Sequence, residues 1–257
     1  MIFYKSKRCL CMGFNSIAEF YSLLFDEKAR LSREGPLLLE ILKQYKQPAQ
    51  VLDLACGSGV HSRFFAEQEA SVIGVDVSPD MLRYAKRQKQ SANIRYIVGD
   101  IVKLPLIGYW DVILCLGNSL CLLPNRNLLS DFFAQIKNLL SPRGTFILQI
   151  LNYEHSDMKE MQTKYVQKEI NGKKVTVIKT LIPDKDVIFL AIHYFAQVQG
   201  KYETSNESNI LLKLSSSELV NYADEVGLSV LSVYGDFQKS TFNPTMNKDV
   251  IIIFFKK

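Results

Sequence analysis

Short apolar runs alternate with helical patterns from about Phe14 to Asn152, and this alternation constrains the fold more than any other feature. The runs are nearly all apolar, as expected for strands that are buried on both faces of a parallel sheet. Strands that alternate with helices need crossover connections, so the pattern predicts an α/β fold with a parallel sheet. The expected strands are Val51–Ala55, Ser71–Val75, Ile94–Val98, Asp111–Leu116 and Thr145–Ile150, and the expected helices are Pro36–Tyr45, Ser62–Gln68, Asp80–Gln90 and Asn127–Leu140.

The rhythm changes after Asn152, where an antiparallel insertion is expected. A hairpin turn signal at Asn171-Gly172 separates two runs of strand character, and a second turn at residues 183–186 precedes a third run. A helix and two final strands follow, and Ser215 or Ser216 is expected to cap that helix. The three inserted runs are Lys164–Ile170, Lys174–Leu181 and Val187–Val198, and the last elements are Ser215–Val226, Leu228–Tyr234 and Val250–Phe255.

These patterns divide the chain into four segments. We expect an N-terminal helical or cap segment at residues 1–35 and an α/β core at residues 36–152. The antiparallel insertion spans residues 153–214, and residues 215–257 return to the core.

The segment Val51–Ser62 carries the main chemical signal. A buried strand leads to Asp53, then Gly57 and Gly59 follow, and a helix begins. Glycines let the backbone turn sharply and let a ligand approach the main chain. A helix that starts just after them presents free N–H groups and the positive end of its dipole. The loop therefore predicts a site for a nucleotide-like cofactor.

Polar residues follow the neighbouring strands at the same sheet edge, where open α/β sheets bind ligands. Asp76 ends the second strand, where a carboxylate can accept hydrogen bonds from ribose hydroxyls. Asp100 follows the third strand. A dinucleotide fingerprint requires a third glycine at the position of Ser62, and Asp53 would repel a pyrophosphate. An NAD-linked oxidoreductase is therefore disfavoured, whereas a cationic cofactor suits the acid.

The loop from Asp53 to Gly59 resembles the first motif of the class I S-adenosylmethionine (SAM) methyltransferases, D-x-[AG]-x-G-x-G. Asp76–Leu82 looks like the ribose acid and the helix start that covers the adenine in that family, and Leu140–Thr145 looks like its turn before the fifth strand. Further stretches are similar to the glycine/sarcosine N-methyltransferase-like group, namely Leu54–Val60, Ile113–Leu120 and Asn152-Tyr153. The resemblance implies a Rossmann-like seven-stranded sheet with helices on both faces and an inserted antiparallel β lid.

The same resemblance implies which residues bind SAM and its product S-adenosylhomocysteine (SAH), without a metal. It implies contacts to the methionine part, the ribose and the adenine, and either Arg30 or Arg33 would pair with the cofactor carboxylate. The cofactor-binding set is Tyr21, Arg30, Asp53, Ala55, Gly57, Gly59, Asp76, Val77, Met81, Asp100, Ile101, Leu116 and Asn118. The candidate catalytic residues are Asn118, Tyr153 and Tyr21.

The implied function is methyl transfer from SAM to a small-molecule acceptor, with an amine nitrogen favoured. Residues 209–215 lack the arginine and tyrosines that bind glycine in the group, so glycine itself is disfavoured as the acceptor. Lys213 stands near the position of that arginine, but an ammonium group cannot make the two parallel hydrogen bonds of a guanidinium. An O- or C-methyltransferase and a non-catalytic SAM-binding protein remain alternatives. An oxygen acceptor would need a base, for which the candidates are His193, Tyr194, Tyr153 and Glu154. His61 is interpreted as a capping or surface residue, and Cys56 as a small apolar residue.

The composition of the chain argues against nucleic-acid, membrane and metal partners. The chain has 257 residues and a net charge of +5, and its densest basic stretch, Arg83–Lys89, falls on an expected helix, where a solvated face is the simpler interpretation. The longest uncharged apolar run, Val112–Pro124, is too short and too interrupted to span a membrane. Five cysteines and three histidines lack disulfide-framework or zinc spacing. We therefore expect a cytoplasmic enzyme without nucleic-acid, membrane or metal partners, whose apolar start is a candidate contact in a homo-oligomer.

Overall fold

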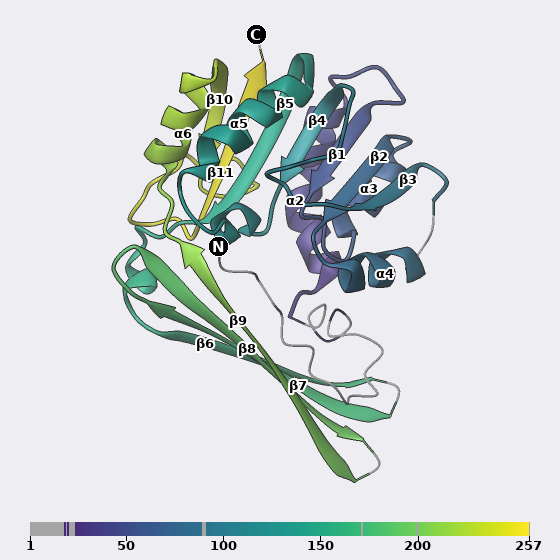
Figure 1. The fold of residues 1–257 in the computed structure, drawn as a ribbon, viewed down its shortest axis with the longest axis vertical. Coiled ribbons are helices and arrows are strands. Elements are labelled where there is room, and N and C mark those ends of the chain that lie inside the picture. The colour runs from purple at the N-terminus through teal and green to yellow at the C-terminus, as the bar shows by residue number, and fades with distance from the viewer. Residues whose placement is uncertain are drawn as a thin grey trace.

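The computed structural model describes residues 18, 20, 24–88, 91–170, 172–198 and 200–256, which form two β-sheets with helices around the larger one. The larger sheet has seven strands in the order β10-β11-β5-β4-β1-β2-β3 (Figure 1). Its strands are β1 Gln50–Leu54, β2 Ser71–Asp76, β3 Ile94–Val98, β4 Trp110–Cys115, β5 Leu140–Leu151, β10 Leu228–Tyr234 and β11 Asp249–Lys256.

The strand pairing confirms the expected parallel α/β core. Strand β1 lies between β2 and β4, and all three run parallel. The pairings β2–β3 and β4–β5 are parallel as well, and β11 joins β5 antiparallel. The carboxyl ends of β1, β2, β3 and β4 therefore share one edge of the sheet.

Helices cover both faces of this sheet. Helices α5 Leu128–Leu139 and α6 Ser216–Glu225 pack on one face, where Phe132, Phe133 and Phe146 belong to one apolar cluster. Helices α2 Glu27–Leu42 and α3 Val60–Glu67 cover the other face, with Leu38 and Phe65 in a second cluster. Helix α4 Pro79–Arg87 follows β2. In Figure 1, α5 and α6 lie on the opposite side of the sheet from α2.

Helix α2 begins nine residues before the expected start at Pro36, so that expectation was wrong, and the helix crosses the expected segment boundary at residues 35/36. The Asp26 carboxylate caps the helix by accepting a hydrogen bond from the Ala29 N–H at 3.0 Å. Pro36 lies inside the helix, although proline removes one backbone hydrogen bond there. Burial of Leu37 and Leu38 against the sheet offsets that loss.

The inserted lid is a four-stranded antiparallel sheet in the order β6-β7-β8-β9, and it extends below the core in Figure 1. Its strands are β6 Gln162–Ile170, β7 Lys173–Pro183, β8 Val187–Val198 and β9 Lys201–Leu212. Three of them were expected. The fourth, β9, was missed because its exposed and half-buried positions alternate among mostly polar residues, which leaves little hydrophobic signal.

The lid is anchored to the core beside the end of β4. Ile188 of β8 and Leu211 of β9 join the apolar cluster that also contains Leu120 and Cys121, from the short 3-10 helix η1 Ser119–Leu122. A separate apolar cluster in the lid, which includes Val177 of β7 and Ile192 of β8, packs against Phe20. The lid therefore starts at the edge of the sheet that carries the candidate residues.

Candidate cofactor site

The glycine loop between β1 and α3 has an unusual backbone. Ala55, Gly57 and Gly59 all have positive φ angles, of 52°, 54° and 75°. A Cβ atom on Gly59 would lie 2.3 Å from the Tyr96 Oη, so the position has no room for a side chain. At Gly57 a Cβ would meet nothing within 4 Å, which leaves the backbone open to a ligand.

A cavity joins this loop to the end of β4 and to helix α2. Ala55 and Gly57, which were predicted to bind the cofactor, line it from the loop, and Leu116, from the same predicted set, lines it just after β4. Arg30 and Asp53, two further members of the predicted set, lie on its wall. The remaining lining residues are Phe25, Glu27, Cys56, Ser58, Val60, His61, Gly117 and Ser119.

Asp76 lies at the end of β2 with both carboxylate oxygens engaged by the backbone. Its Oδ2 accepts a hydrogen bond from the Gly57 N–H at 2.8 Å, and its Oδ1 accepts one from the Ser78 N–H at 2.8 Å. Burial raises the pKa of Asp76, and these two hydrogen bonds oppose that rise. Because each carboxylate oxygen can accept two hydrogen bonds, one acceptor position on each remains for hydroxyl groups of a ligand.

Asp53 is only 2% exposed, and its Oδ2 accepts a hydrogen bond from the Ser62 hydroxyl at 2.6 Å. Burial raises its pKa, while the neighbouring His61, Ser62 and Arg30 lower it. The Ser62 side chain, which stands where a dinucleotide fingerprint would have glycine, thus fastens helix α3 to the end of β1. The acid also lines the cavity.

Arg30, rather than Arg33, reaches the cavity. Its terminal Nη2 lies 3.5 Å from the position that a Cβ would take on Gly117, whereas Arg33 is exposed. Its Nε donates to Glu34 at 3.0 Å, and its guanidinium lies 5.8 Å from the centre of the Phe25 ring. The packing of α2 therefore places Arg30 and not Arg33 at the cavity, and the pairing of Arg30 with the cofactor carboxylate stays a prediction.

Glu34 and His61 form a buried pair beneath Arg30. The His61 Nε2 lies 2.6 Å from the Glu34 Oε2, and both side chains are less than a tenth exposed. The expectation that His61 is a capping or surface residue was wrong, because its ring points from α3 to α2. Burial raises the pKa of Glu34, but His61 and Arg30 outweigh it and hold that pKa below its usual value.

Asn118 and Tyr153 face each other after β4 and β5. The Asn118 Nδ2 donates to the Tyr153 Oη at 2.7 Å, and its Oδ1 accepts from the Leu151 N–H at 2.9 Å. Asn118 adopts a left-handed conformation, with φ of 67°, between two residues that line the cavity, Gly117 and Ser119. Burial raises the pKa of Tyr153, so its phenol remains protonated near neutral pH.

The residues predicted to bind adenine lie after β2 and β3, outside this cavity. Val77 is 72% exposed, and Met81 is half-buried at the start of α4. The exposed Asp100 accepts a hydrogen bond from the Val102 N–H at 3.0 Å, and the carbonyl of Ile101 accepts one from Gln135. Parallel pairing of β2 and β3 brings both loops to one open surface beside Asp76. Tyr21 lies outside the described residues.

Three comparisons with known proteins bear on this arrangement. Residues 51–144 match a family described as methyltransferase domain. Glycine N-methyltransferase from Oryctolagus cuniculus is 32% identical over 147 residues, which are 51% of this chain and 50% of that protein. Glycine/sarcosine N-methyltransferase from Parasynechococcus marenigrum is 28% identical over 237 residues, covering 86% and 77% of the two chains. The chain thus spans about half the length of the rabbit protein and more of the second.

Further relatives extend the match beyond the cofactor half. A dTDP-3-amino-3,6-dideoxy-alpha-D-glucopyranose N,N-dimethyltransferase from Streptomyces fradiae is 24% identical over 220 residues, covering 83% of this chain and 84% of that one. A SAM-dependent methyltransferase structure from Clostridium acetobutylicum has a TM-score of 0.77 at 19% identity, covering 95% and 98% of the chains. A SAM-bound amino pentose methyltransferase from Micromonospora echinaspora has a TM-score of 0.72 at 16% identity, covering 93% and 95%.

Residues 51–144 are thus similar to a methyltransferase domain, and the fold is that of solved SAM-dependent methyltransferases. The matched region begins at Val51 and contains the glycine loop, and the solved methyltransferase structures share both the core and the lid, since the alignments cover nearly the whole chain. Within the part of the chain that the structure describes, no helix is long and apolar enough to cross a membrane, and no group of three or more His, Cys, Asp or Glu side chains could hold a metal ion.

Sequence analysis missed two residues that shape this site. Glu34 carries no sequence signal of its own, because a single acid on a helix is usually solvated. Gln149 is buried in β5, where its Oε1 accepts from the Gly117 N–H at 2.6 Å and its Nε2 donates to Asp249 at 2.7 Å. A polar residue inside the otherwise apolar run of β5 was the signal that could have found it.

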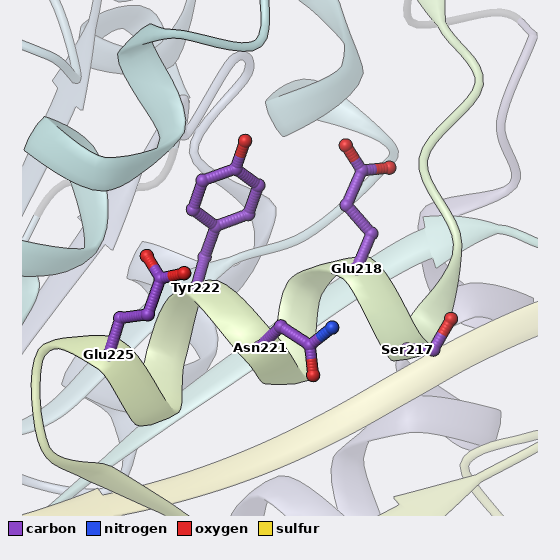
Figure 2. Close-up of a pocket in the computed structure, with 5 residues that line it drawn as sticks. All are labelled: Ser217, Glu218, Asn221, Tyr222 and Glu225. Carbon is purple, nitrogen blue, oxygen red and sulfur yellow. The ribbon is translucent and has the colours of Figure 1, made fainter.

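A second hollow lies on α6, and Figure 2 shows Glu218 and Tyr222 on the same side of that helix. Glu218 pairs with Arg126 at 2.9 Å, and the Tyr222 ring stacks on Phe133. None of its lining residues, Ser217, Glu218, Asn221, Tyr222 and Glu225, belongs to the cofactor cavity. These contacts hold α6 against α5 and offer no arrangement for methyl transfer.

Proposed function

We propose that the protein transfers a methyl group from SAM to a small-molecule acceptor, and that the acceptor atom is an amine nitrogen. The observation that carries the proposal is that the open glycine loop and Arg30 line the same cavity. No described residue accepts a hydrogen bond from either terminal nitrogen of Arg30, although the side chain is only 20% exposed. A guanidinium with two free terminal nitrogens in a largely buried cavity suits a carboxylate ligand.

The other residues around the cavity fit the remaining parts of SAM. The backbone of Ala55 and Gly57 would hold the methionine part, Asp76 would accept hydrogen bonds from the ribose, and the exposed Val77 with Met81 would contact the adenine. When bound, SAM supplies a methyl group on a cationic sulfur, and transfer to an amine leaves neutral SAH and a proton for solvent. The buried Asp53 provides negative charge on the side of the cavity where that cation would lie.

The chemistry of the side chains at the acceptor end favours nitrogen over oxygen. Asn118 cannot ionise, and the raised pKa of Tyr153 keeps its phenol protonated, so neither side chain is available to accept a proton. An amine has a free lone pair once it is deprotonated in solution, so it needs only to be positioned, and positioning alone can contribute on the order of 7–11 kcal/mol. Asn118 and Tyr153 are therefore proposed to orient the acceptor rather than to remove its proton.

Two relatives with N-methyltransferase names align across the lid, the glycine/sarcosine and amino-sugar enzymes. A relative named malonyl-[acyl-carrier protein] O-methyltransferase aligns over only 39% of this chain. The longer alignments include both the core and the lid, so they weigh more. They support an amine acceptor and leave its carbon skeleton open.

The first test is calorimetric titration of the protein with SAM, SAH and NAD, beside an Asp76→Ala variant. We expect micromolar SAM binding that the variant loses, and no binding of NAD. A radiolabelled methyl-transfer assay then screens amines against alcohols and phenols of matched carbon skeleton. A folded protein that fails to bind SAM would overturn the proposal, and methylation of the alcohols or phenols alone would replace nitrogen by oxygen.

A further inference from the structure

We propose that Glu34 and His61 are positioning residues that aim Arg30 at the cofactor carboxylate, an inference that rests on the proposed function. The three side chains form a continuous chain of contacts from α3 to the cavity. Arg30 Nε donates to the Glu34 Oε1 at 3.0 Å, and Glu34 Oε2 lies 2.6 Å from the His61 Nε2. A carboxylate has no proton to donate, so the ring nitrogen is the donor in the second contact.

Arg30 binds Glu34 through Nε alone, and this explains why its two terminal nitrogens remain available to a ligand. Glu34 engages the guanidinium through Nε, which directs the two terminal nitrogens away from Glu34. One of them, Nη2, lies over Gly117, where the absence of a side chain gives it room. Phe25 lies near the guanidinium at 5.8 Å and limits its movement on another side. The fork of the arginine is thereby held open toward the cavity.

His61 is needed because Glu34 is buried. A buried carboxylate is costly unless its oxygens are bonded, and here each oxygen has its own donor. His61 occupies the second position of α3, directly after the glycine loop, so the pair ties the helix that follows the loop to the helix that carries Arg30. The pair therefore helps to fix the two parts of the cavity that would meet the methionine portion of SAM, together with the Arg63–Glu27 ion pair at 2.8 Å between the same helices.

The alternative is that Glu34 and His61 only stabilise the packing of α2 on α3. The two roles differ in what they predict for ligands with and without a carboxylate. SAH carries the amino acid portion, whereas 5′-methylthioadenosine keeps the adenosine and the sulfur but lacks the carboxylate. A positioning role affects SAH alone, and a packing role weakens both ligands together.

The experiment measures the dissociation constants of SAH and 5′-methylthioadenosine by calorimetry for five proteins. Glu34→Gln offers one oxygen and an NH2 group where two oxygens are needed, so SAH should bind at least tenfold more weakly, while 5′-methylthioadenosine changes less than twofold. His61→Leu should act in the same way. His61→Gln places an amide N–H near the position of the ring Nε2 and should restore SAH binding.

Glu40→Gln is the matched control, because Glu40 lies on the same helix in an exposed pair with Lys239. It should leave both ligands unaffected. Thermal denaturation checks that each variant folds. If Glu34→Gln does not fold, the comparison of His61→Gln with His61→Leu provides the test. Equal loss of both ligands, or unchanged or tighter SAH binding in Glu34→Gln and His61→Leu, overturns the inference. A wild-type protein that binds no SAH overturns the proposed function as well.

Discussion

Gly59→Ala should destabilise the protein by an amount that can be worked out from two features of the glycine loop. The residue has a φ of 75°, a conformation that costs an L-residue about 1–2 kcal/mol. The new Cβ would lie 2.3 Å from the Tyr96 Oη, and overpacking of that kind adds roughly 1–3 kcal/mol. The free energy of unfolding should therefore fall by about 2–5 kcal/mol.

Tyr96→Phe separates the two contributions, because it removes the atom that the new Cβ meets first. The Tyr96 hydroxyl is buried and has no hydrogen-bond partner among the described residues, so the single variant should be neutral or more stable by up to about 1 kcal/mol. In the double variant the nearest atoms are the ring Cζ at 3.0 Å and the Ala85 Cβ at 3.1 Å. Part of the clash is thus relieved, and a coupling of about 1–2 kcal/mol is expected.

Urea denaturation, followed by the fluorescence of the single buried tryptophan, Trp110, measures these free energies. Gly57→Ala is the control. It has a similar φ of 54° but open space around its Cβ, so it should lose only about 1–2 kcal/mol and gain nothing from Tyr96→Phe. Additive effects of Gly59→Ala and Tyr96→Phe, with no coupling, would refute the steric argument.

Three further predictions concern the rest of the site. Gln149→Leu leaves the Gly117 N–H without its acceptor and should destabilise the protein by about 1–3 kcal/mol in the same assay. Asn118→Ala should lower kcat while the dissociation constant of SAM changes little; a selective loss of SAM binding would contradict this. Because the pKa of Glu34 is lowered, its contribution to stability is present above about pH 4.5 and is lost as the pH falls through the lowered value; unfolding curves for Glu34→Gln should show a smaller loss across that acid range.

Local signals in the sequence were sufficient for most of the core. The apolar strands and the glycine loop depend on residues that are close in the chain, and the predicted strands match β1, β2, β3 and β4 within a residue or two. Ser215 caps α6 as expected, with its hydroxyl accepting from the Glu218 N–H at 3.2 Å. The lid was located from its turns, yet β9 was missed because a mostly polar strand has weak hydrophobic alternation.

The features that sequence analysis could not give depend on contacts between distant segments. Asn118 was identified from its position after β4, but its bond to Tyr153 joins residues 35 positions apart. The choice between Arg30 and Arg33 also depends on contacts between distant segments. Both lie on one helix, and only the packing of that helix decides which one faces the cavity.

Glu34 shows why such a choice has consequences beyond one residue. Its position four residues after Arg30 puts both side chains on the same face of α2, where they can pair. Its burial then requires a second donor, which the fold supplies 27 residues later from His61. An exposed acid at this position would leave Arg30 free to rotate among many conformers, and each ligand would have to select one of them. By burying the acid between two helices, the chain has ordered the arginine before any ligand arrives, so less conformational entropy is lost on binding.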